Sequence, residues 1–523
     1  MYDIIIKDGN VIDGTGKPMF LADVGIKGDK IAKIGELHDD RGEIEIDARE
    51  KIVCPGFIDV NNHSDTFWQI FLNPDLESLL YQGITTIVGG NCGSSLAPLA
   101  RAETIKAIQK WIDLRTVNFN WLSLNEFFKF LGGGKLSVNF ATLIGHETLR
   151  RGVLEDELRS PNPKEIKYII RSFARSMKDG ALGMSTGLIY THARLAPMSE
   201  LINLARIVKK YDGVYATHTR DEGNELIDSI EESVKISRET KVKLHISHLK
   251  AVGKNNWRKM EDALALIDRA SKSGMDISFD VYPYINTGSV LYTLLPSWVA
   301  EGGKKMMLHR LKDPAIRAKV ISEMEESGFE YDKVEIASSP LDKTLTRRKI
   351  TEIAKFQDKK VEEAIIDILI ASEGRVITSM EVLSEENVKK AILHPLSMIA
   401  TNGSGYSVFH SKTGELVHPR SFGSFSKILA KYVLEEKTLS FEEAVKKMTS
   451  FPAEKFGIEK RGRLKEKYAA DVLVLDKNKI ASPSENGHPY QYSKGVEYML
   501  VNGKIVIKQG KYEKVRNGRI IKR

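Results

Sequence analysis

The strongest constraint on the fold is a repeat of short apolar segments that end in polar residues. We predict one strand in each of eight segments: 56–63, 85–92, 139–146, 181–188, 213–220, 243–250, 276–284 and 397–404. Stretches between them, such as 163–180 and 199–213, have the apolar spacing of helices that bury one face. Strands that alternate with helices in this way predict an α/β protein with a TIM-like (β/α)8 barrel.

Both ends of the chain contain short segments with the alternating pattern of strands. At the start, residues 2–7, a turn at residues 8–10 (DGN) and the segment VIDG predict a hairpin, because glycine tolerates the positive φ of tight turns. Near the other end, residues 471–476 and 497–507 predict further strands, and the second segment contains an Asn502-Gly503 turn. These strands lie outside the region of the barrel pattern.

The pattern predicts two domains. Neither end has enough strands to bury a core alone, so residues 1–55 and 456–523 are expected to form one small β-sandwich domain. Residues 56–455 are expected to form the barrel. The gap between the seventh and eighth predicted strands is too long for one crossover, so an inserted, mostly helical segment is expected at about 287–390. Within the barrel, Ser440 and Glu443 form a capping-box pattern that predicts a helix start.

Composition excludes several kinds of protein. The 78 Lys and Arg against 70 Asp and Glu give a charge of +8 without a cluster of basic and aromatic residues, so no nucleic-acid partner is expected. Two cysteines, Cys54 and Cys92, indicate no disulfide framework and a reducing compartment. No secretory signal pattern and no apolar run near the roughly 18 residues of a membrane span occurs. We therefore expect a soluble, cytoplasmic protein without a membrane partner.

Polar residues that end the predicted strands carry the functional information, because a parallel barrel places its active site at these ends. His63, Cys92, His218 and His248 end the first, second, fifth and sixth predicted strands. A single histidine is more often structural, but several at successive strand ends favour a metal site. One cysteine and two histidines leave a fourth position open, which is typical of catalytic zinc. We predict a metal site there.

Seven segments of the chain carry a further signal: VCPGFIDVNNHSD, GGNCGSSLAPL, GMSTGLIY, YATHTRDEG, HISHLKAVG, HPRSFGSF and MTSFPAEKFGIEKRGRLKEKYAADVLVLD. In order and register, these segments resemble those of the N-acyl-D-amino-acid deacylases (D-aminoacylases) of the amidohydrolase superfamily. The resemblance covers essentially the whole chain. It implies a barrel with a small β-sandwich, zinc, and hydrolysis of the amide bond of N-acyl-D-amino acids.

The resemblance also implies roles for individual residues. Its tightly bound zinc would be held by Cys92, His218 and His248, and we expect one zinc ion per chain. Tyr190 matches a tyrosine that polarises the scissile carbonyl. The carboxylate of a small anionic substrate would be received by Lys250, Tyr282 and Arg420. A cationic fork and a hydroxyl suit such a planar anion.

Two positions depart from the family pattern. Asn61 replaces the first histidine of the His-x-His motif and leaves only His63, and Asn402 replaces the aspartate that serves as general base and second-metal ligand. Asparagine cannot accept a proton at neutral pH, so a second metal is not expected. The candidates for a replacement base are His63 and His192, although a polar loop role for His192 is the alternative. We interpret three others as structural: His146, His245 and His394.

Three hypotheses about function follow. The first is a zinc amidohydrolase that acts on N-acyl-D-amino acids or related small amides. The second is a hydrolase of the same fold that opens a cyclic amide or lactone, whose strain or better leaving group lessens the need for a base. The third is a catalytically silent paralogue that binds a ligand or partner through the carboxylate pocket. The retained ligands, Tyr190 and the expected carboxylate clamp favour an enzyme, whereas Asn402 favours the third hypothesis.

Overall fold

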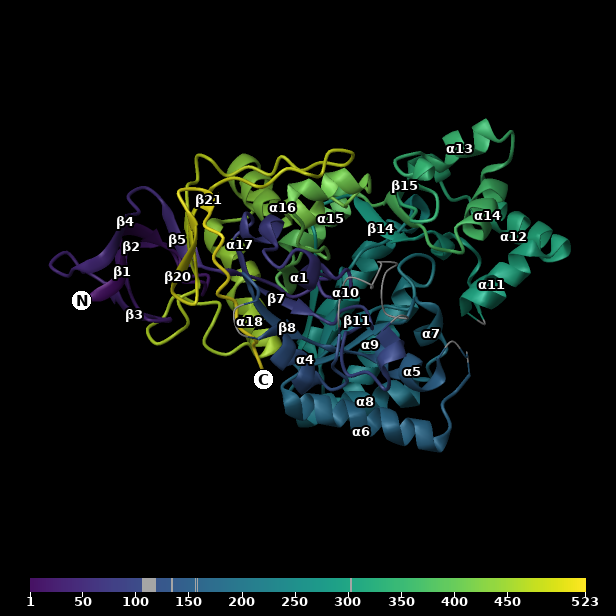
Figure 1. Cartoon of the computed structure of the whole chain (residues 1–523), viewed down its shortest axis with the longest axis horizontal. Helices are drawn as coiled ribbons and strands as arrows, with labels where there is room; N and C mark the ends of the chain where they lie inside the picture. Colours follow the sequence, from purple (N-terminus) through teal and green to yellow (C-terminus); the bar gives the residue numbers. More distant parts are fainter. Residues whose placement is uncertain (106–118, 133–134, 156, 158, 302) are drawn as a thin grey trace.

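The structure is a computed structural model, and it describes residues 1–105, 119–132, 135–155, 157, 159–301 and 303–523. Each of the eight segments predicted to contain a strand does contain one. These strands are β6 (Phe57–Asp59), β7 (Ile84–Gly89), β8 (Asn139–Thr142) with its continuation β9 (Ile144–Gly145), β10 (Gly183–Gly187), β11 (Val214–His218), β12 (Lys243–Ile246), β13 (Ile277–Val281) and β17 (Ser397–Ile399). Helices alternate with them, so the mixed α/β class is confirmed (Figure 1).

The strands pair in parallel within two sheets. One sheet has the order β6-β7-β8, and the other has the order β9-β10-β11-β12-β13-β17. Only Leu143 separates β8 from β9, so these two strands join the sheets. On the other side, Asn62 and Gly403 form an isolated parallel bridge just beyond β6 and β17. The carboxyl ends of the parallel strands therefore lie at one edge of the arrangement.

Helices that follow the strands pack apolar faces against the sheets. The long ones are α6 (Pro163–Asp179), α8 (Met198–Lys210), α9 (Leu226–Thr240) and α10 (Lys259–Lys272). Helix α6 begins at Asn162, whose side chain accepts from two backbone N–H groups in a capping box, and ends at Gly180 with φ 110°. The predicted capping box of Ser440 and Glu443 is confirmed at the start of α17 (Phe441–Met448). The other α-helices that the structure describes in this region are α1 (Gln69–Leu72), α2 (Glu77–Leu80), α4 (Leu124–Leu131), α5 (His146–Leu154), α7 (Thr191–Arg194), α15 (Glu385–Leu393), α16 (Arg420–Lys427) and α18 (Ser450–Phe456).

Strands from both ends of the chain form one sheet, called the terminal sheet below. Its strands in the described residues are β1 (Tyr2–Val11), β2 (Phe20–Lys27), β3 (Lys30–Gly35), β4 (Gly42–Asp47), β5 (Ile52–Pro55), β18 (Val472–Leu475), β19 (Val496–Val501), β20 (Lys504–Lys508) and β21 (Lys511–Tyr512). The ends meet where β5 pairs with β18. An apolar cluster with members from both ends, such as Ile6 and Leu500, is buried there. The predicted joining of the two ends is confirmed, and Figure 1 shows purple and yellow strands side by side.

The hairpin predicted at the start of the chain is wrong. Strand β1 continues through residues 8–10 and pairs with β2 on both sides of them. Asp8 adopts a positive φ of 57°, and its N–H donates to the Asp23 carboxylate at 2.7 Å, so the extra residue is absorbed as an irregularity of the strand. The second predicted turn is confirmed, because Asn502 and Gly503 connect the antiparallel strands β19 and β20 with φ of 47° and 77°.

The segment between β13 and β17 contains more than the helices expected of it. It has α11 (Gly303–Lys312), α12 (Pro314–Glu326), α13 (Ile350–Phe356) and α14 (Val361–Ala371). It also contains a small antiparallel sheet in the order β14 (Asn286–Val290), β16 (Ile377–Glu381) and β15 (Val334–Ser338), which the sequence analysis does not predict. We call residues 286–381 the inserted segment. In Figure 1 it lies at the end of the molecule opposite the terminal sheet.

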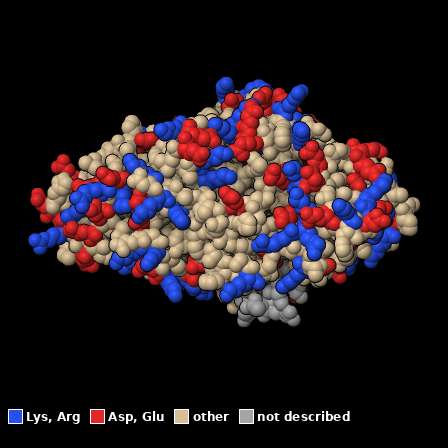
Figure 2. Space-filling model, turned by 90° about the horizontal axis from the view of Figure 1, so that it is seen from above, with Lys and Arg blue, Asp and Glu red and all other residues tan. Residues whose placement is uncertain are grey.

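Surface features are ordinary in the described parts. Lys and Arg side chains alternate with Asp and Glu on the face drawn in Figure 2 and do not gather there into one basic area. Among the helices that the structure describes, none combines the length and the apolar character needed to cross a bilayer.

Candidate metal centre

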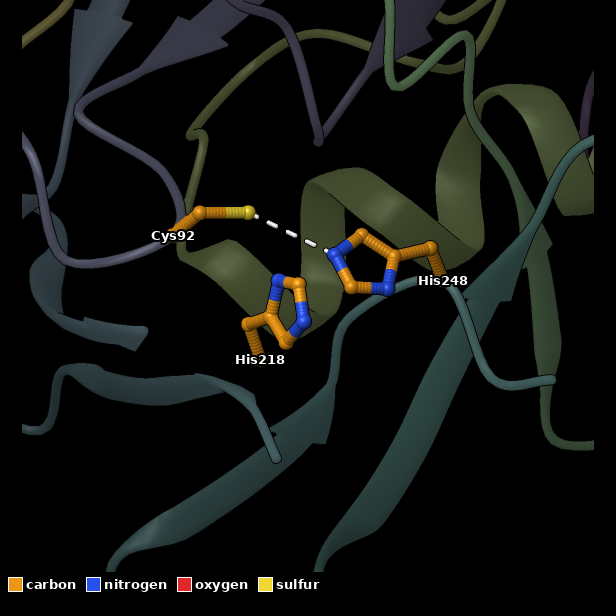
Figure 3. Close-up of side chains that lie close together, drawn as sticks. All are labelled: Cys92, His218 and His248. Atoms are coloured by element: carbon orange, nitrogen blue, oxygen red, sulfur yellow. Dashed lines mark hydrogen bonds between the residues drawn. The ribbon is translucent and has the colours of Figure 1, made fainter. Parts of the chain in front are cut away.

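Three predicted ligands meet at the ends of the parallel strands. Cys92 follows β7, His218 ends β11 and His248 follows β12, and all three side chains are buried. One ligand atom from each lies within 4.8 Å of those of the other two. Cys92 Sγ is 3.4 Å from His248 Nε2, and Figure 3 shows the sulfur and both rings turned toward one another.

The backbone at this site is held in an unusual conformation. Cys92, His248 and Asn402 have φ of 51°, 39° and 44°, in the left-handed region that non-glycine residues rarely occupy. Each of these residues lies one to three positions after a strand end. Such conformations persist only where the surrounding structure enforces them, and they gather at functional sites. These three sharp turns bring the side chains of Cys92, His248 and Asn402 to the ends of the parallel strands.

The donor set fits zinc. One thiolate sulfur and two imidazole nitrogens are ligands that zinc accepts, and three protein ligands leave a position for water or substrate. A histidine must be neutral to bind a metal. Burial and the nearby charge of Lys250 hold the pKa of His248 below its usual range, so this ring is ready to bind.

Glu222 lies directly behind the two histidines, and the sequence analysis did not identify it. Its Oε1 is 3.1 Å from His248 Nδ1 and 3.5 Å from His218 Nε2. The same oxygen pairs with the ammonium group of Lys250. Burial opposes its ionisation, but the charges of Lys250 and His218 hold the pKa of Glu222 well below its usual range. The site therefore contains an ionised carboxylate that is mostly buried.

Lys250 is already engaged within this group. Its Nζ lies 2.8 Å from His248 Nδ1 and 3.0 Å from the carbonyl oxygen of the same residue, in addition to Glu222. These contacts place it on the side of the His248 ring away from Cys92. That Lys250 receives a substrate carboxylate stays a prediction, and in this structure its charge is balanced by Glu222.

The two asparagines that depart from the family pattern both have partners at the site. Asn402 Oδ1 lies 2.9 Å from His63 Nε2, and that nitrogen is 3.8 Å from Cys92 Sγ. Asn61 Nδ2 lies 3.3 and 3.2 Å from the two carboxylate oxygens of Asp280. His63 and Asn402 thus lie beside the predicted ligand Cys92, whereas the amide of Asn61 is held by an internal carboxylate.

The ring of Tyr190 packs against the ring of His218. Its ring centroid is 5.3 Å from that of His218, in an edge-to-face arrangement. Burial and the charge of Cys92 raise the pKa of Tyr190 well above its usual range, so its hydroxyl keeps its proton. A protonated phenol at this position can donate a hydrogen bond to a carbonyl oxygen.

Tyr282 and Arg420 form a pair with unused donors. The guanidinium carbon of Arg420 lies 4.9 Å from the Tyr282 ring centroid. Among the described residues, the Tyr282 hydroxyl and the Nε and Nη1 groups of Arg420 are buried without a hydrogen-bond partner. Unpaired buried donors cost free energy, so they point to an anionic ligand that completes them. Tyr282, Lys250 and His248 also line one small cavity of about 20 Å³.

The other histidines named from the sequence lie outside the set of three predicted ligands. His146 Nε2 is 2.7 Å from Glu200, which also pairs with Arg150, in a buried group beside α5. Arg150 Nε in turn donates to the backbone oxygen of His192, whose side chain is buried. The other two pair with Asp280 (His245) and Asp268 (His394).

A large cleft of about 890 Å³ opens beside the centre. Glu222 and Ile189 line it from the strand-end side, and Tyr292, Met324 and Met380 line it from the inserted segment. The volume is that of a small-molecule site. The inserted segment therefore forms one wall of a cleft that reaches Glu222.

The chain is similar to known proteins along nearly its whole length. The chain matches the sequence pattern of the amidohydrolase family over residues 45–507. It is 30% identical to the D-aminoacylase of Alcaligenes xylosoxydans xylosoxydans over 522 residues, which is 100% of this chain and 98% of that protein. It is 31% identical to the N-acyl-D-glutamate deacylase of the same organism over 521 residues, with 100% and 96% covered.

Solved structures agree. The N-acyl-D-glutamate deacylase from Bordetella bronchiseptica, complexed with zinc and a phosphonate inhibitor, superposes with a TM-score of 0.83 at 29% identity over 100% of both chains. A crystal structure of D-aminoacylase gives 0.83 at 30% identity, again over 100% of both chains. Matches of this extent cover the terminal sheet, the parallel sheets and the inserted segment together. The chain belongs to the amidohydrolase family.

Proposed function

We propose that this protein is a zinc-dependent hydrolase of the amide bond in N-acyl-D-amino acids. The observation that carries the proposal is the buried convergence of Cys92, His218 and His248 in a chain that matches D-aminoacylase along its full length. We propose these three residues as the ligands of one zinc ion. Zinc held there would supply Lewis acidity, which polarises a carbonyl and makes water a better nucleophile at neutral pH.

The other residues have separate proposed roles. Tyr190 donates its hydroxyl proton in a hydrogen bond to the scissile carbonyl oxygen, and its raised pKa keeps that proton available. Arg420 and Tyr282 bind the substrate carboxylate with the donors that have no partner among the described residues. Binding the carboxylate fixes the direction in which the amide enters the site.

We also propose the finer architecture expected from the sequence. The two parallel sheets together form a (β/α)8 barrel, which is supported by the continuity of β8 with β9 and by the bridge between Asn62 and Gly403. Residues 1–55 and 456–523 form the small β-sandwich domain, and residues 56–455 form the barrel. The inserted segment belongs to the barrel domain.

A second candidate reaction is the opening of a cyclic amide or lactone. It is favoured by Asn402, because an amide at this position, 2.9 Å from His63, cannot take a proton from water. A strained ring or a better leaving group reduces the need for that base. The cleft accommodates either kind of small substrate.

Turnover on a substrate panel tests these reactions. The panel contains N-acetyl and N-formyl derivatives of several D-amino acids, their L enantiomers, hydantoins and lactones. We expect hydrolysis of N-acyl-D-amino acids with preference over the L series. Turnover of the cyclic compounds alone would support the second candidate. A zinc-loaded protein without turnover on any compound would support a catalytically silent paralogue.

Metal analysis of the purified protein is expected to find close to one zinc ion per chain. The three ligands form one site, while the amide of Asn61 is held by Asp280 where a second histidine ligand would be needed. Elemental analysis after dialysis against excess zinc measures the ratio. A value near two, with the second ion bound at His63, would contradict the single site.

Replacing Arg420 with glutamine is expected to lower kcat/KM by about 10–100-fold, mainly through KM, since a hydrogen-bonded charge pair with the substrate carboxylate is lost. Lys427→Gln is the matched control. Lys427 lies on the same helix and stacks over another tyrosine, Tyr284, with 4.1 Å between Nζ and the ring centroid. Steady-state kinetics of both variants on one N-acyl-D-amino acid decide the matter, and equal losses would remove the carboxylate role from Arg420.

A further inference from the structure

Glu222 contacts both histidines of the metal centre with a single carboxylate. It lies in the loop after β11, and 13% of its side-chain surface is exposed. Oε1 is 3.1 Å from His248 Nδ1 and 3.5 Å from His218 Nε2. The contact with His248 is made by the ring nitrogen opposite the one that would bind the metal. This is clear from the 3.4 Å between Nε2 of that ring and Cys92 Sγ.

A neutral histidine binds a metal only through the ring nitrogen without a proton. The position of the proton is set by the partner of the other nitrogen. A carboxylate accepts hydrogen bonds only, so it places the proton on the nitrogen that faces it. Glu222 therefore favours the proton at Nδ1 of His248. The Nε2 atom of this ring, on the side of Cys92, is then left to bind.

Lys250 acts against this arrangement at His248. Its Nζ lies 2.8 Å from the same Nδ1 that faces Glu222. An ammonium group has donors and no acceptor, so alone it would make Nδ1 an acceptor and move the ring proton to Nε2. That proton would occupy the position of the metal. The positive charge of Lys250 would also repel a metal ion bound nearby.

The ion pair between Glu222 and Lys250 resolves this conflict. Glu222 engages the ammonium group directly, and Lys250 has a further acceptor in the His248 carbonyl oxygen at 3.0 Å. Lys250 then balances the charge of the carboxylate, so its contact with Nδ1 does not decide where the ring proton lies. We propose that Glu222 is the positioning residue that selects the metal-binding tautomer of His248 and restrains Lys250. This inference rests on the zinc site of the proposed function and not on its substrate.

Zinc affinity of the substrate-free protein tests the inference. Glu222→Gln keeps the size of the side chain but removes its charge and leaves Lys250 beside His248 unbalanced. We expect zinc to bind about 10–100-fold more weakly, measured by competition with a chromophoric chelator. The melting temperature of the metal-free variant is measured beside it, because loss of the counter-charge of the buried Lys250 is expected to lower it as well, and the double variant below removes this contribution.

A double variant distinguishes the tautomer mechanism from loss of packing. Glu222→Gln combined with Lys250→Met removes both opposing groups, and zinc affinity should return to within a few-fold of that of Lys250→Met alone. Glu232→Gln is the matched control, because Glu232 also pairs with a cation, Arg220, and is 15% exposed. It should bind zinc like the parent.

Several results would overturn the inference. Unchanged zinc affinity in Glu222→Gln would do so, as would an equal loss in Glu232→Gln or a double variant as weak as the single one. A parent protein that binds no zinc would overturn both this inference and the proposed function. If the parent binds zinc but hydrolyses no substrate, only the substrate assignment fails, and the affinities still decide the role of Glu222.

Discussion

Replacing Cys92 with alanine is expected to abolish zinc binding and to lower kcat/KM by about 10³-fold or more. The residue supplies the sulfur of the three-ligand set, and two histidines alone hold zinc poorly. Loss of the ion removes both carbonyl polarisation and activation of water, which together are worth several kcal/mol of barrier. Metal analysis and single-substrate kinetics of the variant measure the two effects side by side.

Cys54→Ala is the matched control for this change. Cys54 is also buried, but it lies in β5 and pairs with Leu473 of β18. Burial alone raises the pKa of its thiol far above the usual range, so it stays protonated and is no metal ligand. We expect its zinc content and kcat/KM to stay near those of the parent. Zinc retained in Cys92→Ala, or lost in Cys54→Ala, would place the metal elsewhere.

The second large expected effect is an increase in kcat/KM. Asn402→Asp is expected to raise kcat/KM on an N-acyl-D-amino acid by about 10²-fold, because a carboxylate there can take a proton from the attacking water and return it to the leaving amine. The side chain already points to the site, since Asn402 Oδ1 lies 2.9 Å from His63 Nε2. The φ of 44° does not oppose the change, because aspartate tolerates this region almost as well as asparagine.

Further variants are needed to interpret the effect of Asn402→Asp on kcat/KM. Asn402→Ala removes the amide without adding a base, so it should show no gain. If His63 already serves as the base of a different reaction, Asn402→Asp will leave the natural rate unchanged or lower it, and His63→Ala will abolish turnover. Adding Asn61→His to Asn402→Asp should exceed the single gain only if a second metal then binds, since position 61 now bonds Asp280.

The strand positions were predictable because they depend on local pattern. Each of the eight apolar segments contains a strand, since burial of a parallel strand requires an apolar run whatever its neighbours are. The hairpin at residues 8–10 was wrong for a tertiary reason. Its turn-like residues are held in a strand by the Asp23 carboxylate, which comes from the neighbouring β2.

The site was predictable in part. Residues at strand ends have a common location, so Cys92, His218 and His248 could be brought together from the sequence. Glu222 could not, because an acidic residue in a loop after a strand usually lies in solvent. Only the fold shows that this loop turns back behind both histidines. The partnership of Asn61 with Asp280 also joins distant strands, and a single sequence contains no signal for it.

The terminal sheet imposes an order of events on a growing chain. Strand β5 leaves the ribosome early, but its partner β18 follows roughly 400 residues later, because Pro55 pairs with Val472. At about 5–20 residues per second, this edge waits roughly 20–80 s for its partner. An unpaired apolar edge is a template for association with other chains. On neighbouring nascent chains of one messenger RNA, the β5 edges therefore stay unpaired for most of the time of synthesis. The yield of folded protein then depends on how this edge is shielded before translation ends.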